Sequence, residues 1–417
     1  MIKIPRTIVR FPFSSVRTGL KVILSKYILH GGYIKEFERA FAKYIGVKYA
    51  VSVSCGKMGL YLSLKALGAM EGDEIIVPSY TVWDVPAVII SLGLIPVFVD
   101  INSEDHNLDV TLIEKAVSSK TKFILATHIY GYPCDMASVL KIAQKYNLAV
   151  IEDCAQGLGA EYKGKKVGSI GDIGYFSFGI LKNLNTLGGG MIVTNNAFFA
   201  EKVRREVESF SYPKRMYLVR SFLLSSFLSL FTSPVFFSAF VFPLIYIMGE
   251  YINKIISGVL SDSPPANITD SFSSKYKYKF TNLQAVIGLR QLKDLDNFNN
   301  RRIENAKILI DVLENAEEIS IPKQLPQTQP VYLNYVIQVS ENKREEIIKK
   351  MLKKGVDIGY GFLNSCGSMP EFQRFKKYCP LSDKLSRTNL YIPFHPPLEK
   401  RHVEYIANNL IETLDKL

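Results

Sequence analysis

The chain has 417 residues, of which 47% are hydrophobic and 12% aromatic, so it is long enough to form two domains with sizeable cores. Its formal net charge of +12 at pH 7 indicates an acidic partner: a phosphorylated ligand, an anionic lipid or nucleic acid. The basic residues are scattered and accompany no zinc-ligand spacing and no nucleic-acid-binding motif, which argues against nucleic acid.

The cysteine usage and the amino terminus indicate the compartment. Five cysteines, an odd number without CxxC spacing, are typical of free thiols in a reducing environment. The first 20 residues, MIKIPRTIVRFPFSSVRTGL, contain no continuous apolar core and no cleavage site, so we expect no secretory signal. These features predict a cytoplasmic protein.

The first candidate site is a turn between a strand and a helix. Apolar residues at helical spacing predict a helix within residues 30–46, and a strand over residues 50–53 follows. A short turn ending in Gly56 and Lys57 then leads into a helix that reaches residue 67. Free backbone N–H groups at such a helix start can bind a phosphate, so Gly56 and Lys57 are candidate contacts. The alternative is an ordinary turn that binds nothing.

The next segments alternate strands and helices, as in a parallel β-sheet. Helices are predicted over about 108–117 and 136–146, and strands over residues 74–78, 95–99 and 123–126. Trp83, the single tryptophan, is either a core residue or a ring that stacks on a ligand. His128 and Tyr130 follow the third strand, and we expect them to line the substrate site.

The chain is organised around residues 151–196. An apolar run over 148–151 is followed by Glu152, Asp153 and Gln156. A buried parallel strand delivers polar side chains in this way to the carboxyl edge of a sheet, where α/β proteins bind ligands. Ser177, Lys182 and a run of three glycines (188–190) come next. Such a set can hold a phosphorylated cofactor and form a Schiff base with it, although a lysine beside a glycine turn can equally be a solvated surface residue.

Several of these motifs, in one order, resemble a known family. Asp153-x-x-Gln156, then SFxxxKN from Ser177 and the glycine-rich turn, are similar to motifs of the DegT/DnrJ/StrS family of pyridoxal-phosphate-dependent sugar aminotransferases. The similarity extends to GGYIKEFERAFAKYIGVKYAVSVSCG, VPSYTVWDVPAVIISLGLIPVFVDI, THIYGYPCDM and TNLQAVIGLRQL. It covers nearly the whole chain except roughly residues 209–272.

The resemblance implies a role for each candidate residue. Asp153 would keep the ring nitrogen of pyridoxal phosphate protonated, Gln156 would contact the phenolic side of the ring, and Ser177 would donate to the phosphate. Lys182 would bind the cofactor covalently and move a proton between substrate and cofactor. Some relatives carry histidine at this position and catalyse dehydration or deoxygenation, so Lys182 favours transamination.

Three positions depart from the family pattern. Lys57 stands where threonine is usual, which removes a hydroxyl donor and adds a positive charge. Val82 stands where an aromatic ring usually stacks on the cofactor, and Trp83 is the expected replacement. Lys277 stands where relatives place an asparagine that reaches the phosphate of the neighbouring subunit; a lysine can reach a phosphate as a point charge. The alternative for Lys277 is a solvated basic run.

Residues 221–249 contain no charged residue. Family motifs on both sides belong to one folded unit, so both ends must emerge on the same side of a membrane. Two crossings would need about 40 apolar residues, and Pro234 and Pro243 would break a continuous helix. We therefore expect either a hairpin of short helices that dips into one leaflet or an apolar flap buried in the protein. Basic flanks favour an anionic bilayer surface; they are Lys214, Arg215, Arg220, Lys254, Lys275, Lys277 and Lys279.

The carboxyl-terminal part predicts a connecting helix and a small domain. A long amphipathic helix is expected over 283–313, followed by a strand over 335–339 and a helix over 343–354. Residues 364–369 lie where relatives have a substrate loop. Cys366 in that loop is expected to be an ordinary thiol, the alternative being a nucleophile like that of cysteine desulfurases.

The resemblance implies the α/β fold-type I architecture of pyridoxal-phosphate-dependent aminotransferases, as a homodimer. Residues 1–208 would form the large domain with a mostly parallel sheet, 209–272 an apolar helical insertion, and 273–417 the connecting helix and small domain. The implied reaction moves an amino group from L-glutamate to a keto-sugar that is nucleotide-linked or lipid-linked, in surface-glycan or amino-sugar biosynthesis, without a metal. The alternatives are a sugar dehydratase on the same fold and a membrane-tethered non-catalytic family member.

Overall fold

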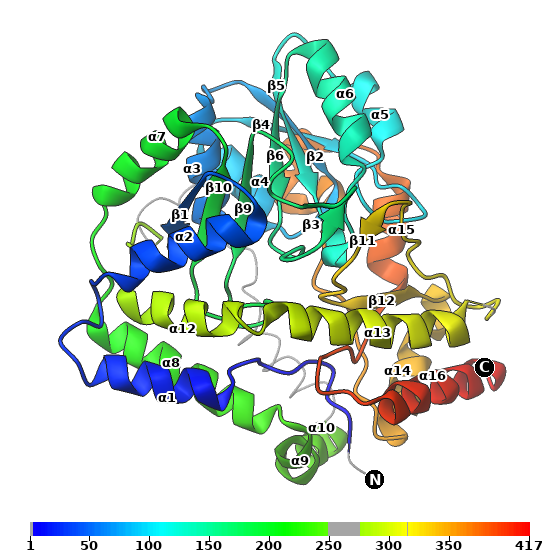
Figure 1. The fold of residues 1–417 in the computed structure, drawn as a ribbon. Coiled ribbons are helices and arrows are strands. Elements are labelled where there is room, and N and C mark those ends of the chain that lie inside the picture. Colours follow the sequence, from blue (N-terminus) through cyan, green and yellow to red (C-terminus); the bar gives the residue numbers. More distant parts are fainter. Residues whose placement is uncertain (1–2, 249–275, 315) are drawn as a thin grey trace.

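The computed structural model describes residues 3–248, 276–314 and 316–417 (Figure 1). Part of the predicted insertion, together with Lys254 and Lys275, lies outside the described residues. A seven-stranded sheet forms the centre of the larger domain, with β6 (Ala149–Asp153) in the middle. The strand order is β1 (Tyr49–Val53), β10 (Gly190–Thr194), β9 (Ile173–Ser177), β6, β5 (Thr121–Thr127), β2 (Glu74–Pro78) and β4 (Ile95–Val99).

The predicted mostly parallel sheet is confirmed. All pairings from β4 to β9 are parallel, whereas β10 pairs antiparallel with both of its neighbours. Successive residues of a strand point to opposite faces, so each face needs its own cover. One face packs on α3 (Gly56–Leu67), α4 (Asp84–Ser91) and α7 (Ala197–Glu208). The other packs on α2 (Tyr33–Ile45), α5 (Val110–Ala116) and α6 (Met136–Tyr146).

The predicted long helix over 283–313 is wrong in one respect, because the structure divides it. The two parts are α12 (Asn282–Leu292) and α13 (Leu295–Leu313). Asp294 between them has φ −104° and ψ 3°, outside helical geometry, and forms a 2.9 Å ion pair with Arg290. The side chain of Gln291 donates to the carbonyl of Asn185 at 2.7 Å and accepts the backbone N–H of Asn185 at 3.1 Å. The last turn of α12 is thus bound to the loop between β9 and β10, next to the break.

The smaller domain is built on α13 and the carboxyl-terminal elements (Figure 1). Its antiparallel strands are β12 (Tyr335–Gln338) and β14 (Asn389–Ile392), covered by α14 (Arg344–Lys353) and α16 (Lys400–Asp415). The strand and the helix predicted there are confirmed within one residue at each end. The remaining elements are β3 (Tyr80–Thr81), η1 (Ile129–Gly131), β7 (Glu161–Tyr162), β8 (Lys165–Lys166), β11 (Thr328–Gln329), η3 (Glu341–Lys343), β13 (Asn364–Ser365), η4 (Cys366–Ser368), η5 (Pro370–Phe375) and α15 (Pro380–Thr388).

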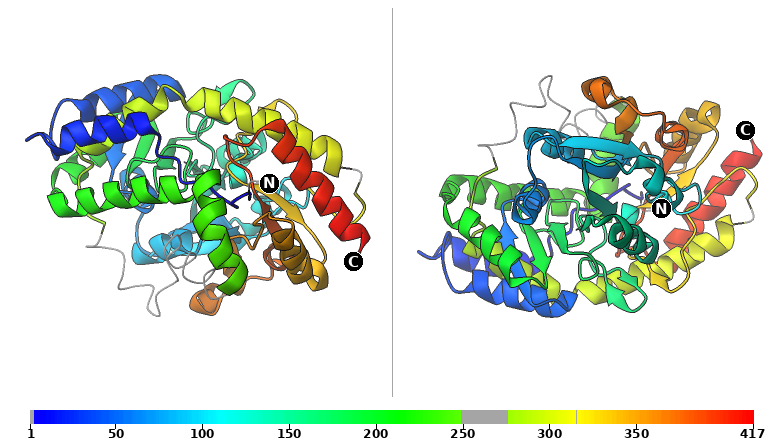
Figure 2. Two further views of the ribbon diagram at one scale, coloured as in Figure 1. Left: turned by 90° about the horizontal axis from the view of Figure 1, so that it is seen from below. Right: turned by 90° about the horizontal axis from the view of Figure 1, so that it is seen from above.

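A third layer lies beyond α12, on the side away from the sheet (Figure 1). It contains α1 (Phe13–Ile23), α8 (Arg215–Phe231), α9 (Pro234–Phe236), the π-helix η2 (Phe237–Val241) and α10 (Phe242–Met248). Seen from below, α1 and α8 run side by side (Figure 2). No single helix among the described residues is long and apolar enough to cross a membrane. Arg215–Phe231 and Pro234–Met248 pass that test of length and composition only as a pair, with a bend of 68° between them.

Candidate active site

Glycines at two turns bring the predicted phosphate contacts together. Gly56 begins α3 beside the end of β9, and a Cβ atom added to it would lie 2.9 Å from the Cβ of Ser177. A Cβ added to Gly179 would lie 3.8 Å from both Ser177 Oγ and Lys182 Cγ. The structure therefore places Gly56, Ser177 and Lys182 around one cradle that side chains at the two glycines would fill.

Asp153 ends β6, the central strand, and is only 6% exposed. Its carboxylate accepts a hydrogen bond from the backbone N–H of Ala155 at 3.0 Å. Burial raises the pKa of Asp153, while the N–H of Ala155, the hydroxyl of Tyr175 and the charge of Lys182 act against that rise. A buried carboxylate with so few donors can accept another from a ligand.

Lys182 lies in the loop between β9 and β10, where its backbone N–H donates to the carbonyl of Gly179 at 3.0 Å. Burial lowers the pKa of Lys182, and the carboxylates of Asp153 and Asp84 oppose this effect. A lowered pKa increases the fraction of the lysine that is a neutral amine, and only the neutral amine can act as a nucleophile or accept a proton. The charges of Asp153 and Lys182 therefore act on each other: Lys182 opposes the rise in the pKa of Asp153, and Asp153 opposes the fall in the pKa of Lys182.

Lys57 takes part in a cluster that the sequence did not reveal. Its ammonium lies 2.8 Å from Asp84 Oδ1 and 3.2 Å from the hydroxyl of Tyr276. It also lies 5.4 Å from the centre of the Trp83 ring. Burial lowers the pKa of Lys57, but Asp84 and Tyr276 more than offset this and the pKa lies above its ordinary value. In the sequence, the one feature that could have drawn attention to Asp84 is its position directly after the single tryptophan, at the start of a helix.

Gln156 is held by an unusual backbone conformation. Its side-chain oxygen accepts the backbone N–H of Tyr130 at 3.0 Å. Tyr130 has φ 56° and ψ 5°, a left-handed conformation that is rare for a large side chain. The ring of Tyr130 is buried, and its hydroxyl lies 2.6 Å from that of Tyr80. The structure thus brings the backbone of Tyr130 to Gln156 and directs its ring between the domains.

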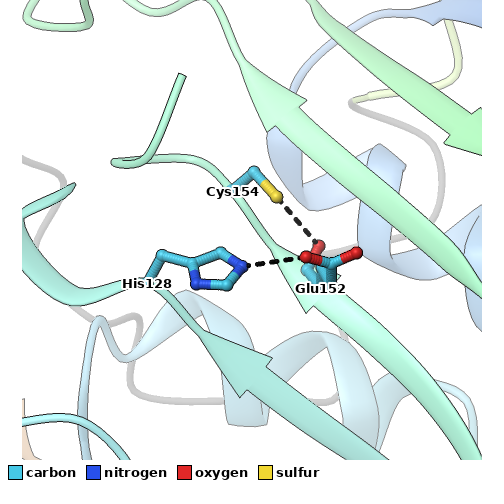
Figure 3. Close-up of side chains that lie close together, drawn as sticks. All are labelled: His128, Glu152 and Cys154. Carbon is cyan, nitrogen blue, oxygen red and sulfur yellow. Dashed lines mark hydrogen bonds and ion pairs between the residues drawn. The ribbon is translucent and has the colours of Figure 1, made fainter. Parts of the chain in front are cut away.

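His128 belongs to a buried cluster with Glu152 and Cys154 (Figure 3). Because His128 Nδ1 accepts the N–H of Cys134 at 3.1 Å, the neutral ring carries its hydrogen on Nε2 and donates to Glu152 at 3.2 Å. Glu152 follows β-strand alternation and points to the face opposite Asp153. The cluster therefore supports the strand end from behind.

The carboxylate of Glu152 is saturated with donors. One oxygen accepts the N–H groups of Ile170 and Gly171, both at 2.7 Å, and the other accepts Gly168 at 2.8 Å as well as His128. Burial raises the pKa of Glu152, but these hydrogen bonds more than offset it, so the pKa lies below its ordinary value. The donor atoms of His128, Glu152 and Cys154 lie within 4.8 Å of one another, yet the carboxylate is already committed to N–H groups and is a poor metal ligand.

Two predicted positions lie farther from the cradle. Lys277 is exposed, and its contact with a neighbouring subunit stays a prediction. Cys366 is buried in η4, where burial raises the pKa of its thiol and keeps it protonated, which disfavours a nucleophile. Pairing of β13 with β3 brings the loop of Cys366 beside the turn that carries Trp83. All five cysteines lie in the described part, and each is a free thiol.

The arrangement fits a phosphorylated pyridine cofactor. Gly56 and Gly179 keep side chains out of the approach to Ser177, beside the start of α3, and a helix start next to a hydroxyl suits a phosphate. The buried carboxylate of Asp153 suits a protonated ring nitrogen, and Lys182 suits covalent attachment.

Comparisons with known proteins agree with this fit. The sequence profile of the DegT/DnrJ/EryC1/StrS aminotransferase family matches residues 16–218 and 262–411, and so leaves out most of α8–α10. GDP-perosamine synthase from Vibrio cholerae is 39% identical over 388 residues, which are 91% of this chain and 90% of that protein. The crystal structure of an aminotransferase from Psychrobacter cryohalolentis superimposes with a TM-score of 0.79 at 26% identity, covering 98% of both chains. A Streptococcus pneumoniae protein solved in its PLP form has a TM-score of 0.75 at 22% identity and covers 99% of both chains.

Proposed function

The chain belongs to the DegT/DnrJ/EryC1/StrS aminotransferase family, whose enzymes use pyridoxal phosphate, and we propose that it transfers an amino group from L-glutamate to a nucleotide-linked keto-sugar. The observation that carries the proposal is geometric: Asp153 lies buried at the end of the central strand β6, and Lys182 lies in the loop after Ser177, whose side chain adjoins Gly56. When bound, pyridoxal phosphate supplies an electron sink that stabilises negative charge on the substrate carbon. The residues described below hold and orient it.

The phosphate end is held by backbone and hydroxyl groups. No side chain caps the start of α3, so its N–H groups would donate to the phosphate, and Ser177 would add a hydroxyl donor. Lys57 contributes positive charge next to this helix start while remaining paired with Asp84. The pair limits how far Lys57 acts as a free cation, so backbone donors carry most of the phosphate contact.

The ring end is held by Asp153 and the reacting end by Lys182. Asp153 would hold a proton on the ring nitrogen, because a buried carboxylate attracts a nearby cation strongly. Lys182, as a neutral amine, accepts the proton from the substrate carbon and returns it on the other side of the transfer. Gln156, held by the backbone of Tyr130, would contact the phenolic side of the ring, and Trp83 would be the aromatic residue that stacks on it.

The substrate class follows from the relatives and from charge. GDP-perosamine synthase, as its name states, makes a nucleotide-linked amino sugar. The formal charge of +12 suits a substrate that carries two phosphates. We propose a nucleoside-diphosphate keto-sugar as the acceptor, in a homodimer in which Lys277 of each subunit reaches toward the cofactor phosphate of the other.

Two measurements test the proposal. Borohydride reduction of the enzyme with its cofactor, followed by peptide mapping, should place the cofactor mass on Lys182, and Lys182→Ala should abolish turnover. Lys165→Ala, a change at an exposed lysine, is the matched control. Labelling at another lysine would refute the assignment.

L-glutamate distinguishes transamination from dehydration. Adding it to the enzyme should change the absorbance of the bound cofactor in the absence of any sugar. A spectrum that responds to a nucleotide-linked sugar but never to an amino donor would instead indicate the dehydratase.

A further inference from the structure

The amino-terminal segment and the apolar insertion form one unit, although about 200 residues separate them in sequence. We call this unit the basal layer and define it as residues 3–27 and 214–248. Three hydroxyls of the insertion bind the backbone of the amino-terminal segment: the N–H of Lys3 donates to Ser238 at 2.7 Å and that of Val9 to Thr232 at 3.0 Å, while Ser229 donates to the carbonyl of Phe11 at 3.2 Å. The two segments therefore run antiparallel.

Side-chain packing also holds the amino-terminal segment and α1 against α8. The rings of Phe11 and Phe222 meet edge to face at 5.5 Å. Gly19 lies so close to the Phe222 ring that an added Cβ atom would clash with it at 2.4 Å. A glycine here lets the two helices approach, which explains how α1 becomes part of the same layer.

The inner face of the basal layer is covered by the enzyme along its length. Leu218 and Phe222 of α8 are buried with Leu283 and Ile287 of α12 in one apolar cluster. On α10, Ile245 packs near Leu352 of the small domain. A helix that is covered on one side by a folded domain cannot be surrounded by lipid, so this geometry excludes a span for α8 and allows only contact along its outer face.

The outer face is apolar to an extent found nowhere else on the described surface. Of the 26 large apolar side chains that are exposed in the described residues, 16 belong to the basal layer. They are Phe13, Leu20, Leu24, Tyr27, Met216, Tyr217, Leu223, Leu224, Phe227, Leu230, Val235, Phe240, Leu244, Tyr246, Ile247 and Met248. On α1 and α8 they recur at helical spacing, so they form continuous outer stripes.

The charge of the layer selects its partner. Neither residues 1–35 nor residues 209–248 contain an aspartate or glutamate. The exposed charges of the layer are all basic: Arg17, Lys21, Lys26, Lys214, Arg215 and Arg220. A symmetric contact between two copies would place these like charges against one another, which is unfavourable. An anionic bilayer suits both features, because its headgroups attract the basic residues and its acyl chains accommodate the apolar stripes.

We propose that the basal layer, with α1 and α8–α10 acting together, is a docking surface for membranes that contain anionic lipid, and that it binds along the interface without crossing. The inference concerns a surface apart from the active site and does not rest on the aminotransferase reaction. It extends the expectation drawn from residues 221–249 by adding the amino-terminal helix to the surface.

Vesicle flotation of the purified full-length protein tests this surface. We expect binding to vesicles of phosphatidylcholine mixed with phosphatidylglycerol, much weaker binding to phosphatidylcholine alone, and release by salt. Replacing Lys21 or Arg220 with Gln should each weaken binding about fivefold, the equivalent of about 1 kcal/mol per charge. Leu24→Glu, at the residue that follows α1, and Phe227→Glu on α8 should each weaken it at least about tenfold.

Phe198→Glu is the matched control, because Phe198 is 62% exposed on α7, outside the basal layer, and its replacement should leave binding unchanged. Unchanged circular dichroism and cofactor absorbance identify variants that are folded. Absence of wild-type flotation with anionic vesicles would overturn the proposal. Unchanged binding of Leu24→Glu would also contradict it. So would bound protein that alkaline carbonate cannot release, since this is the behaviour of a spanning segment. Finally, if the protein without lipid formed oligomers larger than the dimer and Phe227→Glu dissociated them, the surface would be a protein–protein contact instead.

Discussion

Replacing Glu152 with glutamine should destabilise the protein through the buried cluster behind the active-site strand. The substitution keeps the shape of the side chain and exchanges one oxygen for an NH2 group. The remaining oxygen can still accept Ile170 and Gly171. The NH2 group then faces the N–H of Gly168 and Nε2–H of His128, which cannot change tautomer without losing the bond from Cys134.

The magnitude follows from those two lost bonds. Each leaves a buried donor without an acceptor, which costs about 1–3 kcal/mol, so the expected loss is about 4 kcal/mol. A chain of 417 residues has an unfolding entropy of roughly 0.9 kcal/mol/K. The melting temperature should therefore fall by about 4–5 °C.

Thermal unfolding at fixed protein and saturating cofactor concentration measures the effect. Because the folded-state pKa of Glu152 is lowered, its contribution is present above the unfolded-state pKa and is lost as the pH falls through the folded-state value. The difference between wild type and Glu152→Gln should thus stay constant above about pH 5 and narrow below the ordinary glutamate pKa of about 4.3.

Glu114→Gln is the control, because it removes only an exposed ion pair with Lys145, and such surface pairs contribute little to stability. It should shift the melting temperature by about 1 °C or less. If Glu152→Gln shifted it no more than Glu114→Gln does, the donors of the loop would not depend on the carboxylate, and the proposed support of the strand end would be refuted.

Two further predictions concern the site itself. Asp153→Asn should retain cofactor by its phosphate but lower kcat by on the order of 10²–10³-fold, the usual effect of removing a group that stabilises developing charge; a near wild-type rate would exclude Asp153 as the partner of the ring nitrogen. Gly56→Ala should push Ser177 away, because the added methyl would lie 2.9 Å from its Cβ, and we expect weaker cofactor retention in dialysis with kcat at saturating cofactor preserved.

The sequence predicts the central sheet well because its strands have a strong local signal. Apolar runs that end in polar groups locate β6 and Asp153 together, and turn residues mark β1 and α3 on either side of Gly56. Those features depend on neighbours in the chain, so periodicity and turn chemistry suffice to find them.

Features that depend on distant contacts could not be predicted in this way. Apolar spacing continues across Asp294, so the pattern gives no sign that α12 ends where Gln291 meets Asn185. The left-handed backbone of Tyr130 has no sequence signature in a residue that is not glycine. The pairing of Lys57 with Asp84 becomes visible only when α3 and α4 are packed on the same face of the sheet.

The antiparallel fit between the amino-terminal segment and α8 also constrains how the protein is made. Val9 and Phe11 find their hydrogen-bond partners only at Thr232 and Ser229, and β1 finds its strand partner only at β10. At a synthesis rate of about 5–20 residues per second, the first helix waits roughly 10–50 s before those partners leave the ribosome. During that interval α1, which is apolar and basic, is exposed to solvent because its partner helix has not yet been synthesised. The first element to be synthesised therefore docks only after α8 has been made, and a nascent chain stalled before residue 229 should expose Phe13 and Leu24 to chaperones or to the same lipid surface.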